Sequence, residues 1–200
     1  MDKINDYFMN YYKLDILNNR VSTVAYAPKG IPTSHEIREG ISIENTHSIP
    51  FSMELHDIRI TSKLLVGDVS DRFYDFQPNN MAWPIMSEKM KSIIDSHLTG
   101  LEYIEWKEVT INGKTESRKY YVPFFKRKLD ILNMSETVLS PYGIIMIPCF
   151  DKEKIQGLAA FHCPDFDWRI PLKFYINELI KKDLAKAAIK EISFSQARIL

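Results

Sequence analysis

One pattern of residues occurs twice in this chain: a short apolar strand, a polar residue that can cap a helix, an amphipathic helix and a returning strand. The first copy covers residues 84–103 and has Ser87 at the cap position; the second covers residues 174–194 and has Asn177 there. Either side chain can accept a hydrogen bond from the first helical turn, where backbone N–H groups lack helical partners. Two such units predict an α+β fold in which two similarly placed short helices cover mixed, mainly antiparallel sheets.

The two copies of this strand–helix–strand repeat match position by position through the helix. Each helix carries apolar side chains on one face, so we expect both helices to bury the same face. With one residue inserted late in the second copy, the matched apolar pairs are Met90 with Ile180, Ile94 with Leu184, Leu98 with Ile189, Leu101 with Ile192 and Tyr103 with Phe194. Two explanations stay open, a duplicated unit and repeated use of a locally favoured pattern.

Asn112-Gly113 is the clearest turn signal, because it lies between two runs of alternating apolar residues. Such a dipeptide is typical of a β-hairpin. Residues 143–148 are apolar on both faces, which predicts a central strand, and we expect residues 158–162 to pair with it through a turn at 151–157. Further strands are expected at 7–12, 21–26, 49–55 and 192–199, with an acidic connection at 68–80.

The 200 residues are expected to form a single α+β domain, with a β-rich part at 1–80 and a part at 81–200 that holds both copies. Lys and Arg together number 26, as do Asp and Glu, so the formal net charge is zero. Proteins dedicated to binding nucleic acid usually carry an excess of positive charge, and this chain has none. No apolar run approaches the roughly 20 residues of a membrane span, and the N-terminal residues do not resemble a signal peptide. We therefore expect a cytoplasmic protein that binds neither nucleic acid nor membranes.

The candidate motifs for chemistry each lack an essential feature. His35–Glu39 has the first His and the Glu of a zinc-protease helix but not the second His. Residues 161–168 gather His, Cys and Asp side chains, yet a proline among them stiffens the segment against converging on one metal. Cys149 and Cys163 are the only cysteines, too few for a disulfide scaffold, and whether they pair stays open. We predict no catalytic residues, no metal ligands and no cofactor.

Residues 68–75 combine carboxylates with aromatic side chains and keep one alternative function open. The segment lacks the glycine and the closing glutamate of a calcium loop. Its carboxylates are still compatible with a metal-dependent hydrolase or nuclease of unrecognised type. A ligand-binding or phage-derived accessory module is the further alternative. Basic and aromatic residues around the hairpin, at 114–128, also fit single-stranded nucleic acid, but alternate side chains of a strand pack into the sheet.

The repeated segments resemble one group of bacterial proteins, the uncharacterised immunity-type proteins encoded beside polymorphic or contact-dependent toxins. In that group a hydrophobic strand ends in Val-Ser, a short helix follows and a glycine precedes a strand, much as Ser87 and Gly100 are placed here. Further similar segments are 38–40 with 49–55, 74–76, 120–122 and 129–132. The chain departs from the pattern at Asn177 and at Lys190-Glu191, where a serine and a glycine are usual. The resemblance implies a protein that binds and neutralises a cognate toxin, with no catalytic residues to carry over.

Two loops are the expected toxin-binding surface. Protein interfaces are dominated by a few aromatic anchors inside a polar rim, and each loop combines one aromatic side chain with carboxylates. The residues are Asp71, Tyr74 and Asp75 before the first copy, and Asp165, Asp167 and Trp168 before the second. The equivalent placement of the two loops relative to the two copies motivates this choice.

Overall fold

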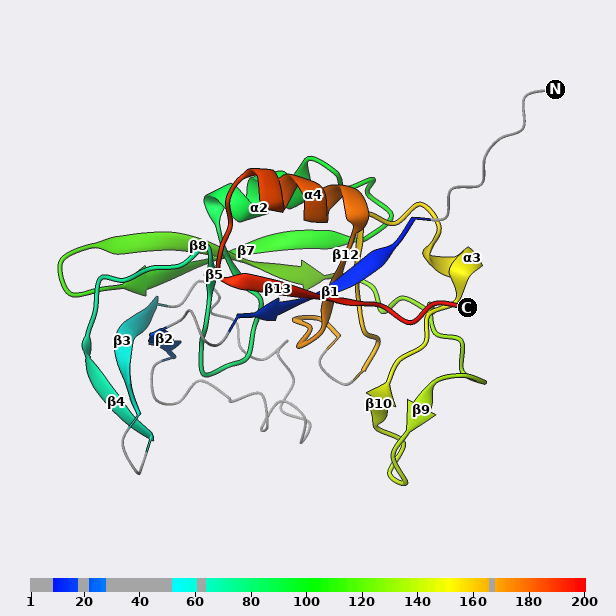
Figure 1. Ribbon diagram of the computed structural model, residues 1–200, viewed down its shortest axis with the longest axis horizontal. Helices are drawn as coiled ribbons and strands as arrows, with labels where there is room; N and C mark the ends of the chain where they lie inside the picture. Colours follow the sequence, from blue (N-terminus) through cyan, green and yellow to red (C-terminus); the bar gives the residue numbers. More distant parts are fainter. Residues whose placement is uncertain (1–8, 18–21, 28–51, 61–63, 166–167) are drawn as a thin grey trace.

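The computed structural model describes residues 9–17, 22–27, 52–60, 64–165 and 168–200. Within these ranges the strands form a seven-stranded sheet, a four-stranded sheet and a separate two-stranded hairpin (Figure 1). Most neighbouring strands are antiparallel, whereas β3 and β7 run parallel. This sheet-dominated arrangement with a few short helices confirms the predicted α+β class.

In chain order the elements are β1 (Tyr11–Ile16), β2 (Thr23–Tyr26), β3 (Ser52–Ile60), β4 (Leu64–Val69), β5 (Phe76–Gln77), β6 (Ile85–Ser87), α2 (Glu88–Asp95), β7 (Ile104–Asn112), β8 (Ser117–Phe125), β9 (Val138–Leu139), β10 (Ile145–Ile147), α3 (Lys152–Ile155), β11 (Ala160–His162), β12 (Phe174–Asn177), α4 (Glu178–Lys186) and β13 (Ile192–Gln196). The large sheet has the order β2-β3-β7-β8-β6-β5, with β4 paired to β3, and the smaller sheet has the order β11-β12-β1-β13.

Several strands predicted in the N-terminal part are present with shifted bounds. The strand expected at 21–26 is β2, and those expected at 7–12 and 49–55 overlap β1 and β3. Residues 7, 8, 21 and 49–51 of these predictions lie outside the described residues. The segment expected as an acidic connection instead contains the end of β4 and the short strand β5, because both find a pairing partner in the large sheet.

The two sequence copies build four-stranded units of the same order, β5-β6-β8-β7 and β11-β12-β1-β13. In each unit an edge strand lies antiparallel to the strand before the helix. The strands before and after the helix then flank a third strand that is antiparallel to both. That third strand is β8 in the first unit, where it follows the helix in the sequence. In the second unit it is β1, which precedes the helix in the sequence.

The registers of the two units correspond residue by residue. Ser87 lies opposite Tyr120, and Asn177 lies opposite Tyr11. The Ser87 side chain accepts a hydrogen bond from the N–H of Met90, as Asn177 does from Ile180. Further matched contacts are the ammonium of Lys91 over the Tyr121 ring and that of Lys181 over the Tyr12 ring. The helix caps therefore confirm the predicted N-termini of both helices.

After the helix, the predicted alignment of the two copies is wrong by three residues. Ile104 lies opposite Phe125, which is five residues after Tyr120 in the central strand β8. Ile192 lies opposite Ile16, which is five residues after Tyr11 in the central strand β1. Ile192 thus corresponds to Ile104, and Leu101 is an exposed side chain in the preceding loop. This loop turns through positive φ angles at Gly100 and Tyr103, which an alignment of apolar residues does not reveal.

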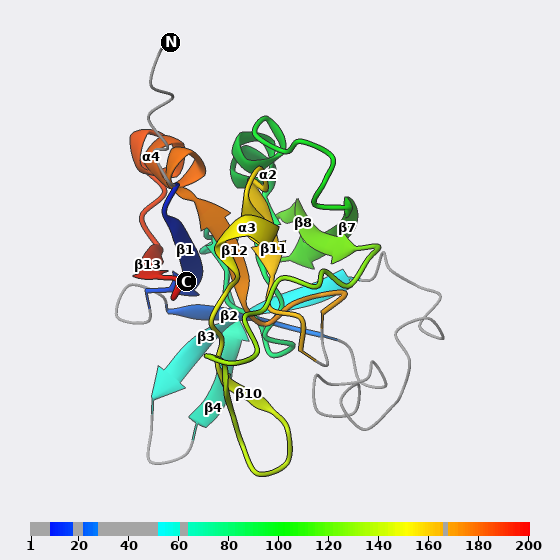
Figure 2. The same ribbon diagram turned by 90° about the vertical axis from the view of Figure 1, so that its right-hand side faces the viewer.

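Helices α2 and α4 lie side by side over the two sheets (Figure 2). Met90 and Ile94 from α2 are fully buried in one core cluster with Ile180 and Leu184 from α4. A hydrogen bond at 2.9 Å between His97 Nε2, just after α2, and Asp183 Oδ2 in α4 also joins the two segments. Residues of both units therefore pack together in one hydrophobic cluster.

The hairpin predicted at Asn112-Gly113 is present, with β7 and β8 paired from Ile104↔Phe125 to Asn112↔Ser117. The central strand predicted at 143–148 is wrong. Strand β10 within it pairs with β9 to form a hairpin outside both main sheets. Its expected partner at 158–162 contains β11, which pairs with β12, and the intervening turn contains helix α3. Apolar residues on both faces of a strand do not by themselves specify what covers them.

Candidate functional site

The first predicted binding loop is held tightly by the fold. The Asp71 carboxylate accepts hydrogen bonds from the N–H and hydroxyl of Thr115 at 2.9 and 2.7 Å, and these bonds lower the pKa of Asp71. Tyr74 is buried, and its hydroxyl accepts a bond from the N–H of Ser22 at 2.9 Å. The Asp75 carboxylate accepts a bond from the Ser87 hydroxyl at 2.6 Å. All three side chains thus stabilise neighbouring elements of the protein itself.

The second predicted loop follows β11. Asp165 is half-buried, and its N–H donates to the carbonyl of Cys163 at 2.8 Å. The half-buried Trp168 packs against the shared core cluster, and the Arg169 guanidinium lies 4.8 Å from the Trp168 ring centre. Asp167 lies outside the described residues.

The structure does not bring the two loops together. Asp71 contacts Thr115 at the turn end of the β7–β8 hairpin, whereas the Arg169 carbonyl accepts from the N–H of Phe125 at the opposite end of β8. At about 3.3 Å per residue, strand β8 separates these ends by roughly 27 Å. The loops are also placed differently in the two units. The first loop precedes the edge strand β5, whereas the second loop follows the edge strand β11, and the residue that corresponds to Asp75 is Ala159, before β11. A surface that uses both loops would therefore have to extend along the whole hairpin.

The residues considered for chemistry have structural surroundings. His35–Glu39 lies outside the described residues. His162 is fully buried, and burial lowers its pKa to about 4. Cys149 and Cys163 are both free thiols and buried, and burial raises the pKa of Cys163 to about 12. Among the described residues, no group of three or more His, Cys, Asp and Glu side chains is placed to hold a metal ion.

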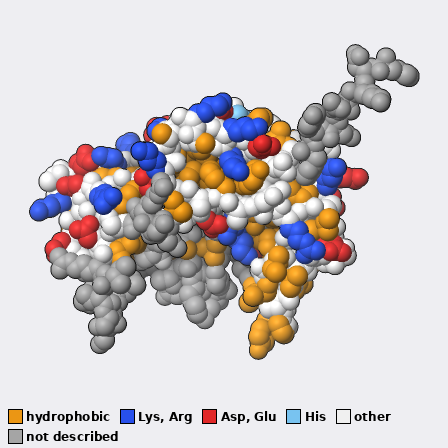
Figure 3. All heavy atoms as spheres, in the orientation of Figure 1, with side chains coloured by type: hydrophobic (Ala, Val, Ile, Leu, Met, Phe, Trp, Pro, Cys, Tyr) orange, Lys and Arg blue, Asp and Glu red, His pale blue; other side chains and the backbone are white. Residues whose placement is uncertain are grey.

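The most distinctive surface is the hairpin of β9 and β10, which we call the apolar arm and define as residues 137–148. The arm contains no charged residue, and hydrophobic side chains gather on it where it projects from the body (Figure 3). Tyr142 is 88% exposed, Met146 60% and Ile147 54%. The other exposed large hydrophobic side chains of the arm are Val138, Leu139 and Ile144. A contiguous patch of this kind marks an interaction surface in proteins more often than scattered apolar residues do.

The arm is well ordered by its own hydrogen bonds. At the tip, the N–H of Ser140 donates to the carbonyl of Ile144 at 2.8 Å, and the Ser140 hydroxyl accepts from the N–H of Tyr142. At the base, the Thr137 hydroxyl donates to the Asn133 carbonyl at 2.9 Å and accepts from the N–H of Cys149. A surface held this way needs little ordering when a partner binds, which favours affinity.

The flanks of the arm connect it to the body of the protein. Arg198 donates to the carbonyl and the carboxylate of Glu136, at 2.9 and 2.8 Å. The ammonium of Lys173 donates to the carbonyl of Ile145 at 3.3 Å. In the described part of the chain, β9 and β10 pair with no other strand, although Lys173 occupies the Ile145 carbonyl of β10. Open strand edges can pair with an added strand.

The apolar arm is the surface that the sequence reasoning missed. The signal was present in the uncharged run at 143–148, which was assigned to the core because apolar residues are usually buried. Among the described residues, no helix is sufficiently long and apolar to cross a membrane. Neither a scan against protein-family models nor a search of curated proteins finds a match to this chain.

Proposed function

We propose that this protein acts by binding another protein through the apolar arm, and that the partner is a bacterial toxin domain that it neutralises. The observation that carries the proposal is the exposure of Tyr142, Met146 and Ile147 on an ordered, uncharged hairpin. The centres of protein interfaces are depleted of charge and enriched in Tyr and Met, and the arm has this composition.

The toxin as partner rests on the resemblance of the repeated segments to immunity-type proteins. The cytoplasm, where such a protein meets its toxin, is a reducing compartment, and two buried free thiols are compatible with it. A standard interface buries about 800 Å² on each partner. The arm then supplies the apolar centre of the contact, and neighbouring charged residues such as Glu136 and Arg198 supply its polar rim.

The experiment is coexpression of this protein with the toxin domain encoded beside its gene. Wild-type protein is expected to restore growth and to copurify with the toxin domain. Met146→Lys and Ile147→Lys place a charge in the centre of the arm, and we expect each to weaken binding by at least about tenfold. Because both side chains are exposed, the thermal unfolding temperature of the free protein should stay close to that of wild type.

Leu101→Lys is the matched control, because Leu101 is also an exposed apolar side chain, at 53%, and lies outside the arm. This variant is expected to bind the toxin domain and restore growth as wild type does. Arm variants that protect cells equally well would remove the arm from the interface. Turnover of a substrate by the purified protein alone, lost on mutation of Asp71 or Asp75, would instead favour a hydrolase.

A further inference from the structure

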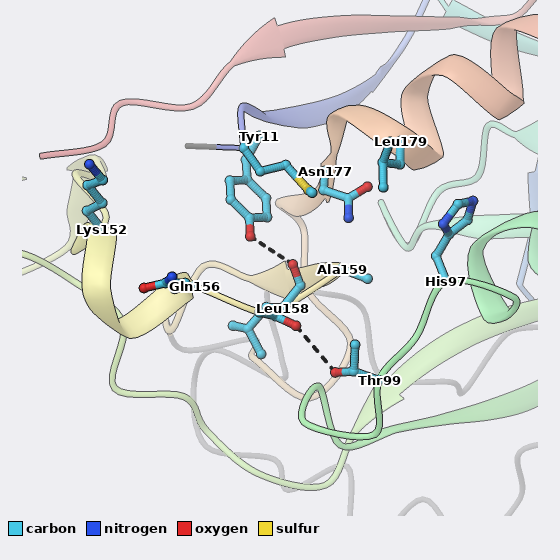
Figure 4. Close-up of a pocket in the computed structure, with 11 residues that line it drawn as sticks. Tyr11, His97, Thr99, Lys152, Gln156, Leu158, Ala159, Asn177 and Leu179 are labelled. Atoms are coloured by element: carbon cyan, nitrogen blue, oxygen red, sulfur yellow. Dashed lines mark hydrogen bonds between the residues drawn. The ribbon is translucent and has the colours of Figure 1, made fainter. Parts of the chain in front are cut away.

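A cavity of about 380 Å³ opens between β1, the start of α4, helix α3 and the loop after α2 (Figure 4). Its size falls in the range of small-molecule sites, which extends from about 300 to 1,000 Å³. Apolar walls come from Met9, Leu158, Ala159 and Leu179, and polar groups come from His97, Thr99, Lys152, Gln156 and Asn177. Such a mixture favours a ligand with an apolar body and one polar head.

The amide of Asn177 is a hydrogen-bond donor directed into this cavity. Asn177 is only 5% exposed, and its Oδ1 caps α4 by accepting from the N–H of Ile180 at 2.9 Å. Its Nδ2 points toward Ala159 in Figure 4 and makes no hydrogen bond within the described part of the chain. Because this nitrogen lines the cavity, a ligand that supplies an acceptor can form a hydrogen bond there.

The repeated architecture identifies the missing acceptor. A second cavity, of about 410 Å³, occupies the corresponding place in the first unit and is lined by Ser87, Asp75 and Tyr120, among others. There the cap residue Ser87 donates its hydroxyl hydrogen to the Asp75 carboxylate at 2.6 Å. In the first unit, the N–H of Ser87 donates to the carbonyl of Asp75. In the second unit, the N–H of Asn177 donates to the carbonyl of Ala159, so Ala159 corresponds in position to Asp75. The matched side chain beside Asn177 is thus the methyl group of Ala159, which offers the cap no acceptor; the buried Glu102 carboxylate nearby accepts from the N–H of Ala159 at 2.7 Å.

We infer that the cavity beside Asn177 binds a small carboxylic acid with an apolar body, whose carboxylate takes the place that Asp75 occupies in the first unit. The carboxylate accepts from Asn177 Nδ2 at the positive end of the α4 dipole. Met9, Leu158 and Leu179 contact the apolar body. This inference does not depend on the apolar arm or on a toxin partner.

Octanoate is a suitable probe, and octan-1-ol has the same apolar chain without the carboxylate. Titration of isotope-labelled protein should give saturable NMR shifts at Met9, Thr99 and Leu179, with a dissociation constant on the order of 1 mM for so small a ligand. Octan-1-ol should bind at least about tenfold more weakly, because it cannot form the charge-assisted hydrogen bond. Absence of saturable octanoate shifts at these residues, or equal binding of the alcohol, would overturn the inference.

Asn177→Asp is the decisive variant. Aspartate keeps the helix cap but replaces the donor by a carboxylate that repels the ligand, so octanoate binding should weaken at least about tenfold. Asn80→Asp makes the same chemical change outside the cavity, where the Asn80 Oδ1 accepts from the N–H of Ala27, and should leave binding unchanged. Wild-type affinity in Asn177→Asp would contradict the proposed contact.

Ala159→Asp gives an independent test because it copies the arrangement of the first unit. Its carboxylate should accept from Asn177 Nδ2 and abolish octanoate binding, while the wild-type NMR spectrum is otherwise retained. Octanoate binding that is unaffected by this substitution would place the ligand elsewhere.

Discussion

The Tyr11 hydroxyl donates a hydrogen bond at 2.8 Å to the carbonyl of Leu158, two residues before the edge strand β11. The hydroxyl of Tyr120 makes the same contact at 2.9 Å with the carbonyl of Tyr74, two residues before the edge strand β5. Both tyrosines are buried and lie opposite a helix cap. Each unit therefore attaches its edge strand to its central strand through one buried phenol, which extends the sequence repeat into the tertiary contacts.

Removing either hydroxyl should destabilise the protein. Tyr11→Phe leaves the carbonyls of Ile155 and Leu158 without this donor, and Tyr120→Phe does so for that of Tyr74. We expect each substitution to lower the free energy of unfolding by about 1–2 kcal/mol, measured by urea denaturation. Tyr12→Phe is the control, because the Tyr12 hydroxyl makes no hydrogen bond among the described residues and the ring contact with Lys181 is retained. A loss in the control equal to that in Tyr11→Phe would argue against a role for the buried bond.

The two helix caps should be interchangeable. Ser and Asn are both good cap residues, so Ser87→Asn and Asn177→Ser should each change the free energy of unfolding by less than about 0.5 kcal/mol. Alanine at either position removes the bond to the N–H of Met90 or Ile180, and at position 87 also the bond to Asp75, so it should cost at least about 1 kcal/mol. Thermal unfolding of the four variants is the measurement. If the exchanges cost as much as alanine, the two caps are not equivalent.

Truncating the matched core positions should have large and similar effects. Met90 and Ile180 are fully buried in the cluster shared by both helices, and alanine at either should cost about 2–5 kcal/mol by denaturant unfolding. Leu179→Ala, next to one of these sites but 46% exposed, should cost clearly less. A Met90→Ala variant as stable as Leu179→Ala would show that α2 contributes little to the core.

Folding stability should decrease as the pH falls from 6.5 to 4 because of His162. The Nε2 of this buried ring lies 3.4 Å from the N–H of Leu129 and Nδ1 lies 3.0 Å from the Cys163 carbonyl oxygen. Burial lowers the pKa of His162 from 6.5 to about 4. In that pH range the unfolded chain binds the proton and the folded protein does not, so protonation favours unfolding by up to about 3 kcal/mol.

The variant His162→Gln isolates this contribution. Glutamine can make both hydrogen bonds but does not titrate, so the loss of stability between pH 6.5 and 4 should be smaller than in wild type. Urea unfolding at several pH values across this range measures the difference. Identical pH dependence in the two proteins would mean that the His162 ring is protonated when folded.

Local structure was largely determined by the sequence alone. Ser87 and Asn177 are followed by helices because their side chains bond the N–H groups of the first turn, a contact that spans only three residues. The hairpin around Asn112-Gly113 likewise depends on neighbouring residues. The correspondence of Met90 with Ile180 was also readable, because the period of a helix fixes which side chains share a face.

Only the tertiary structure decided which surfaces are exposed and which residues meet. Residues 143–148 have the composition of a buried strand, yet they project in the apolar arm because the sheet positions beside β12 are taken by β11 and β1. The acceptor missing beside Asn177 becomes apparent only when Ala159 is matched with Asp75 through the sheet register. Such contacts join segments far apart in the chain, and their geometry depends on how the whole fold packs rather than on local residue preference.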